Sequence, residues 1–326
     1  MAPIQTDKPQ YHSPYHNETH AALREEIREW VSTEIEPNVG EWDEARKVPD
    51  DIYKQMGTRG YLAGLMGMHY PTQYTENRIA SVAPEKWDLF HELLLTDELS
   101  RSASGGFVWN VIGGFGIGCP PLVKFGKKPL VERILPGILN GDKRICLAIT
   151  EPDAGSDVAN ITCEAKLTED GKHYIVNGAK KWITNGIWCD YFTTAVRTGK
   201  DGMNGISVLL IERSFGGVST RKMDCQGVWS SGTSYVTFED VKVPVENLIG
   251  KENQGFKGNA PLYAKLSPNC ILTTATSYHD QLQPRAYRYY HPMYPLLPCM
   301  LRGVRQVRTQ APHIRTNPHL ASCYPP

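Results

Sequence analysis

The sequence lacks any apolar run approaching the roughly 20 residues needed to cross a bilayer, which predicts a chain without a membrane span. Its opening residues, MAPIQTDKPQYHSPYHNETH, have neither an apolar core nor an Arg-rich amphipathic pattern, so they match neither a secretory signal nor a transit peptide. The C-terminal residues CYPP match no address signal. These absences predict an intracellular protein and leave its compartment open.

The eight cysteines lack the spacings that would make them metal ligands or disulfide partners. None forms a C-x-x-C pair, and no histidine stands at metal-ligand spacing from them. We therefore predict buried or incidental thiols in a reducing compartment and no metal site. With 35 basic and 35 acidic residues, the overall charge does not indicate nucleic acid or acidic lipid as a partner.

Acidic residues are almost absent from the last part of the chain. Residues 258–326 hold one acid, Asp280, against seven bases, whereas residues 1–257 hold 34 acids and 28 bases. The same segment holds ten of the 23 prolines and seven of the 16 tyrosines. Proline at this density disfavours helices and central strands. We therefore expect an irregular, disordered tail. One interpretation of its basic residues is that they bind RNA or another anionic partner.

What the sequence does contain changes its periodicity near residue 143. After a disordered start (residues 1–16), residues 17–143 show helical spacing, and one apolar stripe consists of Leu23, Ile27, Trp30, Val31 and Ile35. Residues 144–257 form short segments rich in β-branched and aromatic residues. These observations predict a helical domain followed by a β-domain.

Glycine pairs divide the predicted β-domain into hairpins. Asp170–Gly171, Asn177–Gly178 and Asp201–Gly202 are typical hairpin-turn signals, so we predict antiparallel strands. No β-α-β alternation is present, which argues against a nucleotide-binding Rossmann fold. The string GGFGIG at residues 113–118 stands in a helical context, where we interpret its glycines as packing positions.

Two unusual strings stand about thirty residues apart. AITEPDAGSDVAN (residues 148–160) follows an apolar run with hydroxyls, carboxylates and glycine, and KKWITNG (residues 180–186) places a tryptophan close to a threonine. Polar groups at a strand end can hydrogen-bond a heteroaromatic ligand, and a tryptophan can stack on its plane. Glu151 and Asp157 are carboxylates of the first string, for which turn-stabilising roles are favoured over catalytic ones.

Together these strings closely resemble the acyl-CoA dehydrogenase family. LAITEPDAGSDVAN is similar to the family signature T-E-P-x-A-G-S-D, and GAKKWITNG is similar to its G-x-K-x-W-I-T-N strand. LVKFGKKPLVERILPGILNGD upstream, and FEDVKVPVENLIG and GKENQGFK downstream, resemble further family segments in the same order. Asn160 departs from the pattern, which usually has a small residue there. The resemblance spans residues 17–257.

The resemblance implies an α+β fold and a flavoenzyme. The family has an N-terminal helical domain, a middle antiparallel β-barrel (residues 144–257 here) and a C-terminal four-helix bundle, and is usually homo-oligomeric. It binds FAD, oxidises acyl-CoA thioesters between Cα and Cβ, and passes electrons to an electron-accepting flavoprotein or to oxygen. Its members work in mitochondria, peroxisomes or the bacterial cytoplasm.

The resemblance also assigns roles to individual residues. Thr150 bonds the pyrimidine side of the flavin, Trp182 covers one ring face, and the Thr184 hydroxyl bonds near N5. The full set of expected flavin contacts is Leu147, Ala148, Ile149, Thr150, Ser156, Trp182, Ile183 and Thr184. The expected acyl-CoA contacts are Ser156, Ser231 and Thr233.

The catalytic base of the family is a glutamate of the C-terminal domain, beyond the position of Lys257. Residues 258–326 contain no glutamate, and Asp280 stands in no matching pattern. We therefore expect a truncated family member with no base, in which the tail is an artefact of the gene model and the main oligomer-forming domain is missing. Two alternatives stay open: a non-catalytic remnant acting as a binding or regulatory module, and an interaction protein that works through its basic tail.

Overall fold

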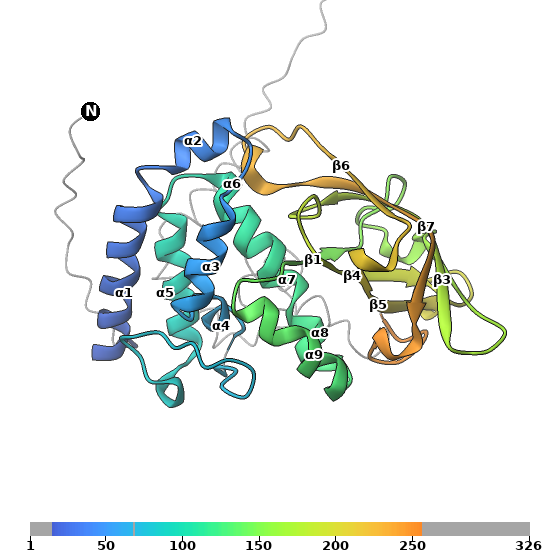
Figure 1. The fold of residues 1–326 in the computed structure, drawn as a ribbon, viewed down its shortest axis with the longest axis horizontal. Helices are drawn as coiled ribbons and strands as arrows, with labels where there is room; N and C mark the ends of the chain where they lie inside the picture. Colours follow the sequence, from blue (N-terminus) through green and yellow to red (C-terminus); the bar gives the residue numbers. More distant parts are fainter. Residues whose placement is uncertain (1–14, 68, 256–326) are drawn as a thin grey trace, which may run out of the picture. The chain divides into compact units, whose positions relative to one another are not determined.

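The computed structural model describes residues 15–67 and 69–255. The predicted disordered N-terminus lies almost entirely, and the predicted irregular tail lies entirely, outside these residues. Helices come first and strands follow (Figure 1). The described α-helices are α1 (Glu18–Trp30), α2 (Val39–Glu44), α3 (Asp50–Thr58), α4 (Tyr61–Gly64), α5 (Leu89–Ser100), α6 (Gly105–Val108), α7 (Gly116–Gly118), α8 (Pro120–Phe125) and α9 (Lys128–Leu139).

Helix α1 shows why the N-terminal part folds as predicted. The Asn17 side chain accepts hydrogen bonds from the N–H groups of Thr19 and His20, which caps the helix. The five residues of the predicted stripe are at most 2% exposed, and a π-helical segment (Val31–Ile35) carries the stripe beyond the end of α1. This apolar face packs against α5, which lies beside α1 in Figure 1.

The strands form one mainly antiparallel sheet. They are β1 (Ile145–Ala148), β2 (Glu164–Leu167), β3 (His173–Ile183), β4 (Tyr191–Arg197), β5 (Ile206–Glu212), β6 (Val218–Lys222), β7 (Ser234–Pro244) and β8 (Leu248–Ile249). The order is β6-β7-β3-β2-β4-β5-β8, and β1 pairs with β4. The predicted fold class is confirmed, although the pairings of β4 with β1 and β2 are parallel, which the hairpin signals did not predict.

Strand β5 joins the two parts of the protein. Its residues alternate between two cores, because successive side chains of a strand point to opposite faces. Val208 and Leu210 belong to the core formed with the helices, whereas Leu209 and Ile211 belong to the core of the β-domain. The continuous apolar run of β5 is therefore the sequence of a strand buried on both faces.

One predicted hairpin turn is wrong. Asp170–Gly171 does turn the chain between β2 and β3, but Asn177–Gly178 lies inside β3, at a shift in its register with β7. Gly178 is needed there because its φ is +144° and an added Cβ would lie 2.6 Å from the Cα of Cys163. The Asn177 side chain bonds Asp240 across the irregularity instead of closing a turn.

Residues 105–125 form a continuous helical stretch, built from α6, a π-helical segment (Trp109–Phe115), α7 and α8. By length and composition alone this stretch could cross a membrane, a property that was not predicted from the sequence. Within the protein, however, 61% of its most apolar window is buried, as is common for core helices of soluble proteins. The predicted packing role is confirmed for Gly118, where an added Cβ would lie 2.5 Å from the backbone of Cys146.

The described cysteines match the predicted burial. Cys119, Cys146, Cys163 and Cys189 are buried as free thiols, and Cys225 is partly exposed. Burial raises the pKa of the Cys146 thiol well above its ordinary value. These thiols therefore behave as small apolar groups of the core.

Candidate functional site

The two unusual strings of the sequence meet at the end of β1. The strand ends at Ala148, and its continuation lies against β3, where the backbone C=O of Thr150 accepts a hydrogen bond of 2.8 Å from the N–H of Lys181. This contact lies outside the strand ladder of β1, which pairs with β4 and not with β3, and no local sequence pattern predicts it. The fold thus brings together the two segments that were predicted to form one site.

A bulge in β3 turns Trp182 toward solvent. The register between β3 and β7 shifts between Lys180 and Ile183, and Trp182 has a φ of +63°, which is uncommon for a residue other than glycine. The Trp182 side chain is 53% exposed, whereas the next residue, Ile183, is 2% exposed. The bulge therefore presents a large aromatic surface beside Thr150.

Three of the expected flavin contacts carry a hydroxyl group. Thr150 and Thr184 are half-buried and Ser156 is exposed. Within the described residues, none of these three hydroxyls makes a side-chain hydrogen bond, although the neighbouring Thr162 hydroxyl does. The preceding residues Leu147 and Ile149 are half-buried and Ala148 is buried. An exposed indole with free hydroxyls fits a flat ligand that carries hydrogen-bonding groups on its edge.

The helical domain closes one side of the site. A Cβ on Gly113 would lie 3.6 Å from the methyl carbon of Thr184, and a Cβ on Gly114 would lie 2.7 Å from Cβ of Asn185. Asn185 is fully buried and donates from Nδ2 to the Tyr53 hydroxyl at 3.1 Å. That hydroxyl in turn donates to the backbone C=O of Asn110 at 3.0 Å. Tyr53 and Asn110 were not predicted as site residues, because neither carries a motif of its own.

Two of the three expected acyl-CoA contacts, Ser231 and Thr233, are linked to the site through the backbone of Asn185. The N–H of Asn185 donates to the C=O of Ser231 at 3.0 Å. Ser231 and Thr233 are 1% and 6% exposed, and their hydroxyls bond each other at 2.8 Å. Both hydroxyls are thus already paired, in contrast to that of Ser156. Their predicted role in substrate binding stays a prediction.

Glu151 is a structural carboxylate in this structure. It is 4% exposed and accepts hydrogen bonds from the N–H of Thr162 (2.6 Å), the N–H of Cys163 (3.0 Å) and Nζ of Lys180 (2.7 Å). Burial by itself raises the pKa of Glu151, but the charge of Lys180 and these donors outweigh it, so that the net pKa is lowered. A carboxylate held in this way is a poor proton acceptor.

Two surface hollows lie away from the expected contacts. Two open hollows, of about 490 and about 900 Å³, are lined by residues other than the expected flavin and substrate contacts. The first lies around Asn77 and Asn140, and the second around Thr162 and Arg197. Neither of these two hollows contains an expected contact, so we define the candidate site by its exposed groups.

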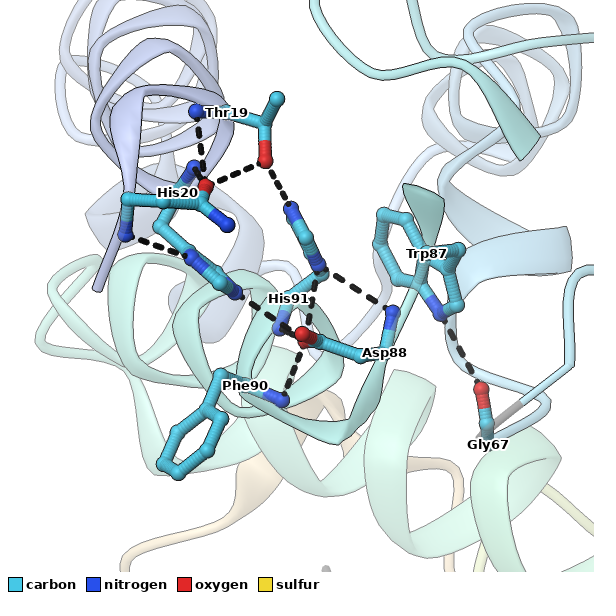
Figure 2. A network of polar contacts seen from close by, with 8 residues as sticks. Thr19, His20, Gly67, Trp87, Asp88, Phe90 and His91 are labelled. Atoms are coloured by element: carbon cyan, nitrogen blue, oxygen red, sulfur yellow. Dashed lines mark hydrogen bonds and ion pairs between the residues drawn. The ribbon is translucent and has the colours of Figure 1, made fainter. Parts of the chain in front are cut away.

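A second polar cluster joins the N-terminal ends of α1 and α5 (Figure 2). His20, Asp88 and His91 place ligand-type atoms within 4.8 Å of one another. However, Nδ1 of His20 accepts from the N–H of Asn17, so the neutral ring carries its proton on Nε2, 3.0 Å from Asp88 Oδ1. A metal ion would need the lone pair of that Nε2. Apart from the bond from Trp87 to the C=O of Gly67, the bonds shown in Figure 2 are those of two cross-linked helix caps.

Acid should weaken this cross-link. Burial, and next the neighbouring His20, lower the pKa of the His91 imidazole below its ordinary value of 6.5. The His91 pKa is therefore lower in the folded chain than in the unfolded chain, where it has the ordinary value. Between these two pKa values the unfolded chain binds a proton that the folded chain does not, so the free energy of unfolding falls as the pH drops below about 6.5. We expect the Tm to fall less between about pH 7.5 and 5.5 in His91→Gln, which keeps a capping side chain without a titrating ring.

His69→Gln is the matched control, because His69 is exposed. It should show the wild-type pH dependence in the same thermal unfolding series. If His91→Gln lost stability as steeply as the wild-type chain, this account of the cap would be wrong.

Two family models match the chain. The model described as "Acyl-CoA dehydrogenase, N-terminal domain" matches residues 17–142, and the one described as "Acyl-CoA dehydrogenase, middle domain" matches residues 146–241. The second match contains both strings of the candidate site. The order of the two matches is that of the helices and strands described above.

Curated relatives and solved structures agree with these matches. Acyl-CoA dehydrogenase apdG of Emericella nidulans is 42% identical over 75% of this chain and 57% of its own length. Cyclohexane-1-carbonyl-CoA dehydrogenase of Syntrophus aciditrophicus is 33% identical over 71% of this chain and 57% of its own length. The chain therefore spans little more than half the length of each of these relatives.

Among solved structures, an acyl-CoA dehydrogenase from Geobacillus kaustophilus has a TM-score of 0.67 at 26% identity, over 91% of this chain and 78% of that one. An acyl-CoA dehydrogenase complexed with FAD from Bacillus anthracis has a TM-score of 0.66 at 27% identity, over 77% of this chain and 41% of that one.

Proposed function

We propose, because this chain belongs to the acyl-CoA dehydrogenase family, that its candidate site holds the flavin ring of FAD for the α,β-dehydrogenation of an acyl-CoA thioester. The observation that carries the proposal is the meeting of the two strings, through the 2.8 Å bond from Lys181 N–H to Thr150 C=O. The solved relative that contains FAD supports the choice of cofactor.

The exposed groups of the site fit the flavin. The Trp182 indole would cover one face of the ring, and the Thr150 and Thr184 hydroxyls would bond its edge. Ser156, which is exposed at the same strand end, would reach both the flavin and the thioester. FAD supplies the redox chemistry when bound, as a hydride acceptor.

The residues of this chain would bind and orient, whereas proton abstraction needs a further group. A proton α to a thioester is removed by a carboxylate base that can approach the substrate. Glu151 is committed to its buried hydrogen bonds, and the family base is expected after Lys257, where Asp280 is the one acid. We therefore propose in addition that this chain has only weak dehydrogenase activity.

Anaerobic addition of acyl-CoA thioesters to the FAD-loaded full chain tests this extension. Loss of the flavin absorbance near 450 nm should be about 10²- to 10⁴-fold slower than in a relative that has its base, because general-base catalysis contributes about that factor. Bleaching at the rate of such a relative would contradict the proposal of a weak enzyme and would require another base.

Deleting residues 258–326 tests whether the tail contributes to the proposed flavin site. Flavin binding should be unchanged by the deletion, since the proposed contacts all precede residue 257. Loss of flavin binding in the shortened chain would show that the tail belongs to the site. A full-length chain that binds no flavin would favour the alternative of a non-catalytic remnant.

A further inference from the structure

Within its described residues, the β-domain buries both partners of one ion pair beside the candidate site. Nζ of Lys180 lies 2.7 Å from Oε1 of Glu151, and the two side chains are 0% and 3% exposed. Lys166 and Glu164 form a pair with the same 2.7 Å separation on β2, but their side chains are 74% and 43% exposed. A buried pair is costly to desolvate and is weak evidence for stability, so its burial beside the site calls for another explanation.

The buried pair connects three segments that are distant in sequence. Lys180 is part of β3 and also donates to the C=O of Ile149 at 2.9 Å, just after β1 ends. Glu151 reaches the N–H groups of Thr162 and Cys163, just before β2 begins. The two bonds of Lys180 therefore hold the residues on either side of Thr150 against β3, and the bonds of Glu151 tie the same segment to the residues before β2.

The pair also stands where β3 leaves its ladder. Lys180 still pairs with Val236 of β7, but the register then shifts, and the N–H of the next residue, Lys181, bonds Thr150. This shift gives Trp182 its positive φ and its exposed position. At the start of the bulge, the Lys180 ammonium group bonds the C=O of Ile149, and the N–H of Lys181 bonds the C=O of the next residue, Thr150.

From these contacts we infer that the Lys180–Glu151 pair is a positioning element that fixes Thr150 relative to Trp182 and Thr184. The inference rests on the proposed function for its consequence, which is the affinity for FAD. Neither side chain touches the flavin in this account. They act by holding two flavin-facing segments in one geometry before the ligand arrives.

The test is the double variant Glu151→Gln/Lys180→Met, which removes both charges with little change of shape and leaves no buried charge unpaired. The matched control is Glu164→Gln/Lys166→Met, which removes the exposed pair of equal separation. Two quantities are measured on the full chain: the dissociation constant for FAD, from flavin fluorescence, and the exchange rates of the Lys181 and Cys163 amides without FAD.

We expect the double variant to bind FAD at least about tenfold more weakly and to exchange both amides at least about tenfold faster, while the control matches wild type. Wild-type FAD affinity in a folded double variant would overturn the inference. If the wild-type chain bound no FAD, the proposed function would fail, and unchanged amide exchange would separately overturn the positioning role.

Should the double variant not fold, Glu151→Asp gives a second test. It keeps the charge near Lys180, but its shorter side chain cannot reach all of the partners of Glu151 at once. FAD affinity should again fall, with faster exchange at Cys163 than in the control. Unchanged affinity together with faster exchange would overturn the inference.

Discussion

Trp182→Ala should weaken FAD binding by about 10- to 100-fold while leaving the fold intact. Stacking of a planar heterocycle on an aromatic side chain is worth about 1–3 kcal/mol, and each 1.4 kcal/mol corresponds to a factor of about ten in the dissociation constant. The side chain is 53% exposed in the structure, so its removal takes little from the core. The Tm should therefore change by no more than a few degrees.

Leu167→Ala is the control for this variant. Leu167 is 52% exposed on β2, so the substitution removes a similarly exposed apolar side chain away from the site. Fluorescence titration with FAD gives the dissociation constants of both variants. Equal affinities of Trp182→Ala and Leu167→Ala would mean that the indole does not cover the ring.

Gly118→Ala should destabilise the protein strongly, although it adds a single methyl group. The added Cβ would lie 2.5 Å from the backbone carbonyl carbon and 2.8 Å from Cα of Cys146 in β1, and backbone cannot move as a side chain can. Overpacking of this kind costs about 3 kcal/mol, which for a domain of this size lowers the Tm by about 6–12 °C.

Gly40→Ala is the matched control for Gly118→Ala. Gly40 lies in α2 with nothing within 4 Å of an added Cβ, so alanine should leave the stability unchanged or raise it by up to about 1 kcal/mol. Calorimetric unfolding compares the two variants with wild type. A Gly118→Ala chain as stable as Gly40→Ala would show that the helical stretch does not pack on β1 as described.

The sequence predicted those parts of the fold that local periodicity determines. The stripe from Leu23 to Ile35 has the spacing of a helix that is buried on one face, and it is buried as expected. The prediction of a turn at Asn177–Gly178 was wrong because the same dipeptide suits both a tight turn and a bulge. The proximity of Cys163, which decides between the two, is a tertiary contact that no local pattern records.

The contacts that join the two strings were not predicted, for a similar reason. The strings around Thr150 and Trp182 are recognisable because each places its unusual residues close together in sequence. Their contact through Lys181, and the bonds of Tyr53 and Asn110 to the site, join residues that are far apart in sequence. Such contacts exist only once the chain has folded, so the helical side of the site was not foreseen.

The most direct test of the flavin site is the visible absorbance spectrum of the purified full chain, mixed with FAD and then freed of unbound flavin by gel filtration. We expect a yellow protein with a flavin band near 450 nm that is much weaker in Trp182→Ala. A colourless wild-type protein would contradict the claim that these two segments form a flavin site in this chain.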